Sequence, residues 1–346
     1  MRAMVVRRYG PPEVFESREV PDPQPKPGEV LIRVKAIGVN FADLLQRMGL
    51  YPGTPKPPFV PGIEISGVVE KVAAAEPGKP GEAETFRPGD AVAGYTSLNA
   101  YGEWAAVPAR QIFRLPPGMP FEDAAAIPVN YLTAYHSMFA MGNLQSGDRI
   151  LIHSAAGGVG IAAVQLARAH GVTIFGTAGP AKQEMLRRLG VEHAINYEKD
   201  DFVQIVRKYA PDGIEMVMDP IGGKSFARSQ QCLGPTGRLV IYGFSAAAGP
   251  GGKKSLVRGV QALLQTPRFH PLKLMRQNTA VIGVNLGRMP ARGNLLRGEM
   301  DEIFRMYTGG KIKPVIGKTF PLASAAAAHQ YIHERKNIGK VILAVK

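Results

Sequence analysis

A glycine-rich turn near the middle of the chain has the residue types and the spacing of a phosphate-binding loop. In "RILIHSAAGGVGIAAVQLA", Gly157, Gly158 and Gly160 stand between a strand-like run and a helix-like run. Glycines at these positions allow a tight turn, a close approach of the backbone to a pyrophosphate, and close packing of the helix on the strand. The amide groups that open such a helix face the phosphate oxygens. The turn therefore predicts a dinucleotide site, although Ala155 replaces the first glycine of the G-x-G-x-x-G pattern.

The end of the next strand-like run indicates which dinucleotide binds. A site for NAD usually places an Asp or Glu there, which accepts a hydrogen bond from the ribose 2′-hydroxyl. The segment "VTIFGTAGPAK", residues 172–182, contains no acid and ends in Lys182. Small residues beside a lysine suit a 2′-phosphate, so the sequence favours NADPH.

The residue types give little support for a metal site or for a catalytic nucleophile. A catalytic zinc needs about three protein ligands and a structural zinc four, yet Cys232 is the only cysteine. His329 and His333 have i,i+4 spacing but no evident third ligand, so we interpret them as a pair on a helix surface and expect no metal. The segment "IHSAAG" is not a G-x-S-x-G nucleophile elbow. The remaining chemistry is hydride transfer, in which the cofactor carries out the chemical step and the protein binds and orients it.

The elements that must position this site alternate regularly. From Ile150 onward, five strand–helix units in sequence predict a parallel, doubly wound sheet with right-handed crossovers, and "TAVIGVNL" is a candidate sixth strand. Before about Pro120, short β-type runs between Gly, Pro and Asp predict a barrel or partly open sheet. Roughly the last 55 residues return to short helix and strand, and we expect them to rejoin this first domain.

Composition and charge narrow the class of protein. The chain has 346 residues, 45% of them hydrophobic, which fits a globular α/β protein of two domains. Of 42 Lys and Arg, 12 lie between Pro220 and Gly298, where there is no acid. This basic stretch suggests an anionic ligand or surface, but no nucleic-acid-binding motif accompanies it, so we expect no nucleic acid partner. One cysteine and no visible signal peptide favour a reducing, cytoplasmic location.

Several motifs together resemble one family. "AAGGVG", Lys182 and Tyr197 look like the quinone oxidoreductase branch of the medium-chain dehydrogenase/reductases, and "GVNFADLLQRMGLYPG", "GKIKPVIGKTFPL" and "KNIGKVIL" are similar to that branch as well. The basic "KKSLVRGVQALLQTPRF" and "VIGVNLG" resemble its synaptic vesicle membrane protein-like subgroup. The resemblance covers essentially the whole chain. It implies a GroES-like catalytic domain over residues 1–125 and 290–346, a Rossmann NADPH-binding domain over residues 126–289, and a homodimer.

The resemblance also implies site residues. Zinc is not expected, because Ile63 stands where zinc-dependent relatives have a histidine ligand. The 2′-phosphate would contact Gly179, Lys182 and Tyr197, and Thr133 would lie near the nicotinamide. The rest of the cofactor would be held by Ala156, Gly157, Gly158, Val159, Gly160, Gly243, Asn285 and Asn337.

The acceptor is expected beside three polar residues of the "GVNFADLLQRMGLYPG" segment. Hydride transfer to an activated double bond or a quinone makes an oxygen enolate-like, and such an anion needs a hydrogen-bond donor. Asn40 can donate an amide hydrogen bond, and Asp43 either takes part or only caps a helix. Tyr51 resembles the catalytic tyrosine of related enoyl-thioester reductases, so it either donates a proton or stacks on the acceptor.

Three functions remain open at this point. The leading one is an NADPH-dependent reductase of quinones or α,β-unsaturated carbonyls. The second is an enoyl-CoA reductase, whose substrate phosphates the basic stretch could receive. The third is a non-enzymatic NADPH-binding protein at a membrane surface, because residues 253–265 form a basic amphipathic pattern. A lid or dimer-interface helix would give the same pattern.

Overall fold

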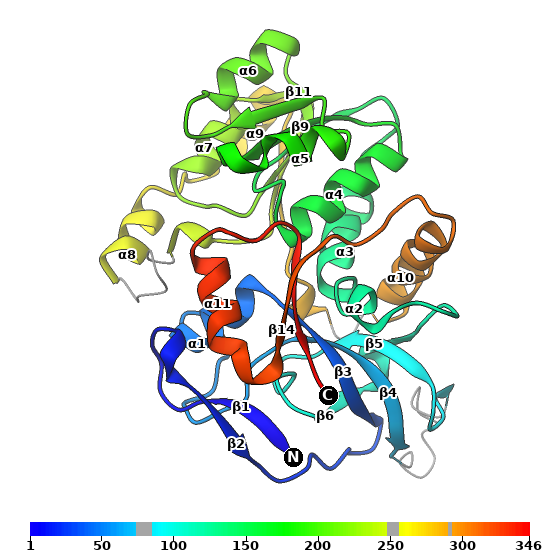
Figure 1. The fold of residues 1–346 in the computed structure, drawn as a ribbon. Coiled ribbons are helices and arrows are strands. Elements are labelled where there is room, and N and C mark those ends of the chain that lie inside the picture. Colours follow the sequence, from blue (N-terminus) through cyan, green and yellow to red (C-terminus); the bar gives the residue numbers. More distant parts are fainter. Residues whose placement is uncertain (74–84, 248–255, 290–292) are drawn as a thin grey trace.

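The computed structural model describes residues 1–73, 85–247, 256–289 and 293–346, which form two lobes around two large sheets. Figure 1 shows one lobe with the central part of the chain and the other with both chain ends. The second lobe also holds α11 (Ala325–His333), which lies beside α1 (Phe41–Met48). Segments far apart in sequence therefore build one lobe.

The lobe of the chain ends is a GroES-like, β-rich domain. Its main sheet has the order β14-β15-β3-β4-β5-β7 within the described residues, and β6 also pairs with β3. The antiparallel pairing of β15 with β3 places Val341 opposite Val39, so the C-terminal segment does rejoin the N-terminal one. The strands are β3 (Glu29–Val39), β4 (Glu64–Val72), β5 (Ala91–Tyr95), β6 (Trp104–Pro108), β7 (Ile112–Arg114), β14 (Ile316–Pro321) and β15 (Lys340–Ala344), with β1 (Arg2–Val6) and β2 (Phe15–Glu19) in a separate pair.

The central lobe is a Rossmann fold. Its six described strands are all parallel in the order β10-β9-β8-β11-β12-β13, which confirms the predicted doubly wound sheet. The strands are β8 (Arg149–Ile152), β9 (Thr173–Ala178), β10 (His193–Asn196), β11 (Ile214–Asp219), β12 (Leu233–Ile241) and β13 (Ala280–Gly283). Helices α4 (Gly158–Ala169), α5 (Gln183–Arg188), α6 (Phe202–Tyr209), α7 (Lys224–Gln230), α8 (Leu256–Leu264) and α9 (Pro271–Gln277) belong to the same segment.

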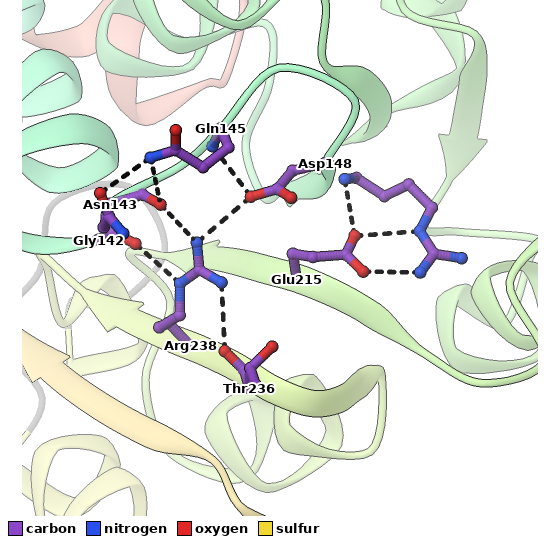
Figure 2. Close-up of polar contacts among 8 residues, drawn as sticks. Gly142, Asn143, Gln145, Asp148, Glu215, Thr236 and Arg238 are labelled. Carbon is purple, nitrogen blue, oxygen red and sulfur yellow. Dashed lines mark hydrogen bonds and ion pairs between the residues drawn. The ribbon is translucent and has the colours of Figure 1, made fainter.

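Charged contacts tie the amino ends of the Rossmann strands together. Figure 2 shows Arg238 of β12 donating to the carbonyl oxygens of Gly142 at 2.7 Å and Asn143 at 2.9 Å, in the loop that leads to β8. Its guanidinium also pairs with Asp148 at 3.4 Å. Two carbonyls and a carboxylate around one planar donor fix β12 against this loop. The opposite, carboxyl ends of the strands are where such sheets bind ligands.

The uncharged, largely apolar stretch 124–141 has the composition of one buried helix, but it does not form one. Helix α2 (Phe121–Ala124) ends at the first residue of this stretch, and α3 (Pro128–Tyr135) begins at Pro128 and continues as a π-helix over His136–Met141. Proline lacks an N–H and fits only the first turn of a helix, so Pro128 starts a new one. Residues 293–308 form α10, and His136 bonds to Glu299 on it. Among the described residues, no helix is both long and apolar enough to span a membrane.

Candidate active site

The glycine-rich turn lies where β8 leads into α4 and leaves no room for side chains. A Cβ on Gly158 would lie 2.5 Å from Nδ2 of Asn130 on α3, and one on Gly160 would lie 2.3 Å from the carbonyl oxygen of Ser154. Either distance is too short for a real side chain, so glycine is needed for the turn and for its packing on α3. The first amide groups of α4 have no partner within the helix and can face an anion.

The C-terminal loop of the other domain crosses this turn. The N–H of Gly339 donates to the carbonyl oxygen of Ala156 at 2.9 Å, and Gly157 pairs with Gly339 in an isolated parallel bridge. Val159, in the first turn of α4, is half-buried. The place predicted for the pyrophosphate is therefore bounded by both domains.

Lys182, Tyr197 and Gly179, which we expect at a 2′-phosphate, lie together at the carboxyl ends of β9 and β10, and their contact with a phosphate stays a prediction. A Cβ on Gly179 would lie 3.4 Å from the Tyr197 hydroxyl. Lys182 Nζ donates to the carbonyl oxygen of Asn337 at 2.6 Å. Burial, and then the nearby charge of Arg335, lowers the pKa of Lys182. A half-buried ammonium with a neutral partner beside it is well placed to receive an anion.

Sequence reasoning missed Arg335, which the structure brings to this cluster. Its guanidinium donates to the Tyr197 hydroxyl at 3.4 Å across 138 residues of sequence, from the loop between α11 and β15. Arg335 has a φ of 57° and an exposed side chain. The nearest carboxylate oxygen to Gly179 belongs to Glu198, 3.7 Å from a Cβ built there, and Glu198 is also exposed. The cluster thus holds two cations from different domains.

Tyr51 reaches the Rossmann domain from the catalytic domain. It follows α1 and the left-handed residue Gly49, whose φ is 68°. Its hydroxyl lies 3.7 Å from the point where a Cβ on Gly287 would be. Asn285 caps the same short turn by accepting a hydrogen bond from the Gly287 N–H at 3.0 Å. Two predicted site residues, Tyr51 and Asn285, are therefore brought to one place between the domains.

Two further predicted cofactor residues occupy the ends of elements. Thr133 lies on α3 and is half-buried, one turn along from Asn130. Gly243 follows β12, where a Cβ would come within 3.0 Å of the carbonyl oxygen of Pro220. Contact of either residue with a cofactor stays a prediction.

Asn40 has no amide hydrogen left for an acceptor in this arrangement. Its Nδ2 donates to the carbonyl oxygen of Gly38 at 3.0 Å and to Oε2 of Glu64 at 2.9 Å. Its Oδ1 accepts from Lys340 Nζ at 2.7 Å, and Lys340 also forms a buried ion pair with Glu64. The other Glu64 oxygen accepts from the Val129 N–H at 2.7 Å. Asn40 is held as part of a satisfied, charge-neutral cluster.

Asp43 is fully buried and bonds within its own domain. Oδ2 accepts from the Asn40 N–H at 2.9 Å, which caps α1, and from the Tyr101 hydroxyl at 3.1 Å. Oδ1 has no partner among the described residues. Burial raises the pKa of Asp43 to about 7. Of the two roles the sequence left open for Asp43, this geometry matches the helix cap.

The interpretation of His329 and His333 as a surface pair is wrong for His329. Its side chain is fully buried, and its Nε2 lies 2.9 Å from the Tyr101 hydroxyl. Arg47 donates to Nδ1 of His329 at 3.2 Å and also to Nε2 of His333. Burial and the charge of Arg47 lower the pKa of His333 to about 4. Spacing alone could not reveal this, because the partner Arg47 lies 282 residues away in sequence.

Within the described ranges, no three His, Cys, Asp or Glu side chains gather as metal ligands would. Cys232 is buried, and burial raises the pKa of its thiol to about 12.

Comparison with known proteins agrees with this geometry. Residues 26–117 match a family profile described as the alcohol dehydrogenase GroES-like domain, and residues 189–343 match one described as zinc-binding dehydrogenase. The human synaptic vesicle membrane protein VAT-1 homolog is 40% identical over 351 residues, covering 99% of this chain and 86% of that protein. Human quinone oxidoreductase is 31% identical over 356 residues, covering 99% and 97%.

Solved structures of similar proteins extend the comparison. A mycobacterial protein in complex with NADPH has a TM-score of 0.86 and 30% identity, with 100% of both chains covered. The CurK enoyl reductase has a TM-score of 0.82 and 26% identity, with 100% of this chain and 99% of that chain covered.

Proposed function

Since this chain belongs to the medium-chain dehydrogenase/reductases, in the branch of the quinone oxidoreductases and VAT-1 homologs, and is an oxidoreductase of that family, we propose that it uses NADPH to reduce a quinone or an α,β-unsaturated carbonyl without zinc. The observation that carries the proposal is the pair of cations Lys182 and Arg335: Arg335 donates to the Tyr197 hydroxyl, and its charge helps to lower the pKa of the half-buried Lys182. A 2′-phosphate distinguishes NADPH from NADH, and two cations and a hydroxyl in one cluster are the donor set it needs.

The chain's own groups fit the rest of the cofactor. The glycine turn presents free amide groups with no side chain in the way, and the loop at Gly339 covers the turn from the other domain. When bound, NADPH supplies the hydride. The protein holds its phosphates at the start of α4 and at Lys182, and α3 bounds the place where the nicotinamide would lie.

Tyr51 is the group we assign to the acceptor oxygen. Hydride arrives at a carbon of the acceptor, and the electron pair of the reduced bond moves to the conjugated oxygen, which becomes an enolate or hydroquinone anion. That anion takes a proton, and the Tyr51 hydroxyl between the domains can provide it or stabilise the charge before water does. Asn40 is not assigned to the acceptor oxygen, because its amide is engaged by Glu64 and Lys340.

Zinc independence is part of the proposal. The described residues offer no three-ligand cluster, and Ile63 cannot ligate a metal. The description of the matched family as zinc-binding belongs to that family, whose members need not all keep the ligands.

An enoyl-thioester remains a second candidate acceptor. The similarity to CurK enoyl reductase and three exposed cations of the basic stretch, Arg268, Lys273 and Arg276, favour it. In Figure 1, however, α9, which carries Lys273 and Arg276, lies in the part of the Rossmann domain away from α1. That placement favours a small acceptor.

Cofactor affinity tests the proposal directly. We expect the protein to bind NADPH at least tenfold more tightly than NADH, because each well-placed cation contributes roughly 1.5–3 kcal/mol to a phosphate contact. Lys182→Ala and Arg335→Ala should each weaken NADPH binding by about tenfold or more and leave NADH binding almost unchanged. Lys208→Ala, on the exposed face of α6, is the matched control and should change neither. Equal affinity of the unmodified protein for both dinucleotides would refute the NADPH assignment.

A further inference from the structure

Helix α1 has an unusual buried face, since three of its five buried side chains are polar. Asp43, Gln46 and Arg47 are at most 1% exposed, beside the apolar Leu44 and Met48. Burying a polar side chain costs free energy unless it forms hydrogen bonds. A fully hydrogen-bonded set of polar side chains also fixes one packing arrangement of the helix, whereas an apolar face would tolerate several. Gln46 is bonded at both ends of its amide, to the carbonyl oxygen of Ser97 and the N–H of Gly62.

The other two polar side chains of α1 are joined through α11 by a chain of hydrogen bonds with one direction. Arg47 can only donate, so Nδ1 of His329 accepts and its Nε2 carries the hydrogen. That Nε2 then donates to the Tyr101 oxygen at 2.9 Å. The Tyr101 hydroxyl hydrogen is left for Asp43, at 3.1 Å. Every donor in the chain Arg47–His329–Tyr101–Asp43 thus finds an acceptor.

Packing holds this chain in place. The His329 ring meets Phe15 edge-on with centroids 4.8 Å apart, and it meets the Tyr101 ring at 90°. Gly62, with a φ of 99°, leaves the space that the Tyr101 ring occupies, because a Cβ there would lie 2.3 Å from the ring. Arg47 lies on α1, His329 on α11, and Tyr101 between β5 and β6, so only the folded domain brings these three side chains together.

The two ends of α1 carry the buried Asn40 and Tyr51, the residue proposed for the acceptor. Asn40 is its N-cap, and Tyr51 follows its C-terminal glycine. A small rotation or translation of α1 would move both. We propose that Tyr101, His329 and Arg47 are positioning residues, whose hydrogen-bond chain from α11 to Asp43 sets the orientation of α1 and thereby places Tyr51 for the acceptor. The inference rests on the proposed function for its kinetic consequence, but its structural part can be measured without activity.

The charged groups around this hydrogen-bond chain indicate that its hydrogen bonds depend on pH. Asp43 is faced by Lys340 and Glu64 as well as by Tyr101, and Arg47 is faced by both histidines and by the charge of the exposed Glu13. Burial keeps the pKa of His329 well below its ordinary value, and burial raises the pKa of Asp43 to about 7. The hydrogen bond from Tyr101 favours the ionised carboxylate and opposes that rise.

Tyr101→Phe is the sharpest test, because it removes one hydroxyl and keeps the ring. We expect a KM for a small quinone at least threefold higher in Tyr101→Phe, with the dissociation constant of NADPH unchanged. We also expect the midpoint of the KM–pH profile to move to higher pH, since Asp43 loses a bond to its charged form. Tyr307→Phe is the matched control: it deletes a tyrosine hydroxyl that donates to another carboxylate, Asp123, at 2.8 Å, and should leave both quantities unchanged.

Hydrogen exchange provides the readout that needs no substrate. The amides of α1 should exchange about tenfold faster in Tyr101→Phe than in the unmodified protein or in Tyr307→Phe, while those of α4 stay the same. If the unmodified protein reduces a quinone and the two variants behave alike in KM, pH profile and exchange, the inference is wrong and the proposed function stands. If no acceptor is reduced, the proposed function fails, and the exchange of α1 alone decides the inference.

Discussion

Two residues far apart in the sequence, Lys182 and Arg335, carry the chemistry that we propose for this site. Lys182 could be predicted, because it follows a recognisable strand and no acid precedes it. Arg335 could not, because an exposed arginine in a loop carries no signal until the fold brings it to the Tyr197 hydroxyl. The same holds for Lys340, which lies buried against Glu64 and Asn40 from a distant strand. Residue types predict a site where the partners are local in sequence, and miss it where they are not.

Tyr51→Phe separates proton donation from stacking. If the hydroxyl protonates the acceptor, its loss should lower kcat by roughly a hundredfold, the scale of general acid catalysis, while KM changes little. If the ring only stacks, phenylalanine should serve as well as tyrosine. We predict the first outcome, measured as steady-state kcat with a simple enone, together with an unchanged dissociation constant for NADPH. A kcat within twofold of the unmodified protein would assign the proton to water.

At the scale of elements, the Rossmann strands could be predicted closely and the helices around the acceptor less well. Apolar runs bounded by glycine, proline and acidic residues indicate β8 to β11 and the carboxyl-terminal half of β12, whereas its first half, from Leu233, includes the turn-like segment Gly234–Gly237 and reads as a helix end. By contrast, the run from 124 to 141 contains a helix start at Pro128 and a π-helix, which a periodicity of 3.6 residues cannot indicate. The polar buried face of α1 could not be predicted either, because the burial of Asp43 and Arg47 depends on α11.

The buried carboxyl of Asp43 gives α1 a stability that depends on pH. Its pKa is about 7 in the folded protein and about 4 in the unfolded chain. Between these values the folded state binds more protons, so the contribution of Asp43 makes stability fall as pH rises from 4 to 7 and remain low above 7. His333 acts in the opposite sense, because its folded pKa of about 4 lies below its ordinary value and stability is lost as pH falls from about 6.5.

Asp43→Asn isolates the first effect. Asparagine keeps an oxygen that can accept from Asn40 and Tyr101 but cannot ionise. The Tm of Asp43→Asn minus that of the unmodified protein should therefore be more positive at pH 8 than at pH 5. Thermal unfolding at the two pH values measures this difference. A Tm difference of the same size at pH 5 and at pH 8 would mean that Asp43 does not titrate in this range.

At the scale of the whole molecule, the basic stretch divides into structural and exposed parts. Arg228 pairs with Asp201, and Arg238 is fixed at the base of the sheet. Lys253 and Lys254 lie outside the described residues, so half of the predicted amphipathic helix can be assessed. There, Val260, Leu263 and Leu264 are 55%, 65% and 82% exposed. These three apolar side chains are therefore uncovered by the part of the chain that the structure describes.

A second copy is the occupant we expect. Strand β13 is the edge of the Rossmann sheet among the described residues, and an edge strand is suited to a twofold contact. We predict a dimer by light scattering, and a shift toward monomer in Leu263→Ser/Leu264→Ser with the cofactor site intact. Leu295→Ser, an exposed leucine on α10, is the control. A monomer that sediments with anionic vesicles would instead support the membrane-surface function.

The central claim is that this protein is a zinc-independent, NADPH-dependent reductase of a small conjugated carbonyl or quinone. Its most direct test is the rate of NADPH oxidation with a quinone, a simple enone and an enoyl-CoA side by side, on protein treated with a chelator and checked for metal content. We predict turnover of the quinone or the enone at an undiminished rate after chelation, with enoyl-CoA reduced more slowly. Activity that disappears with one equivalent of zinc, or no oxidation of NADPH with any of the three acceptors, would contradict the account.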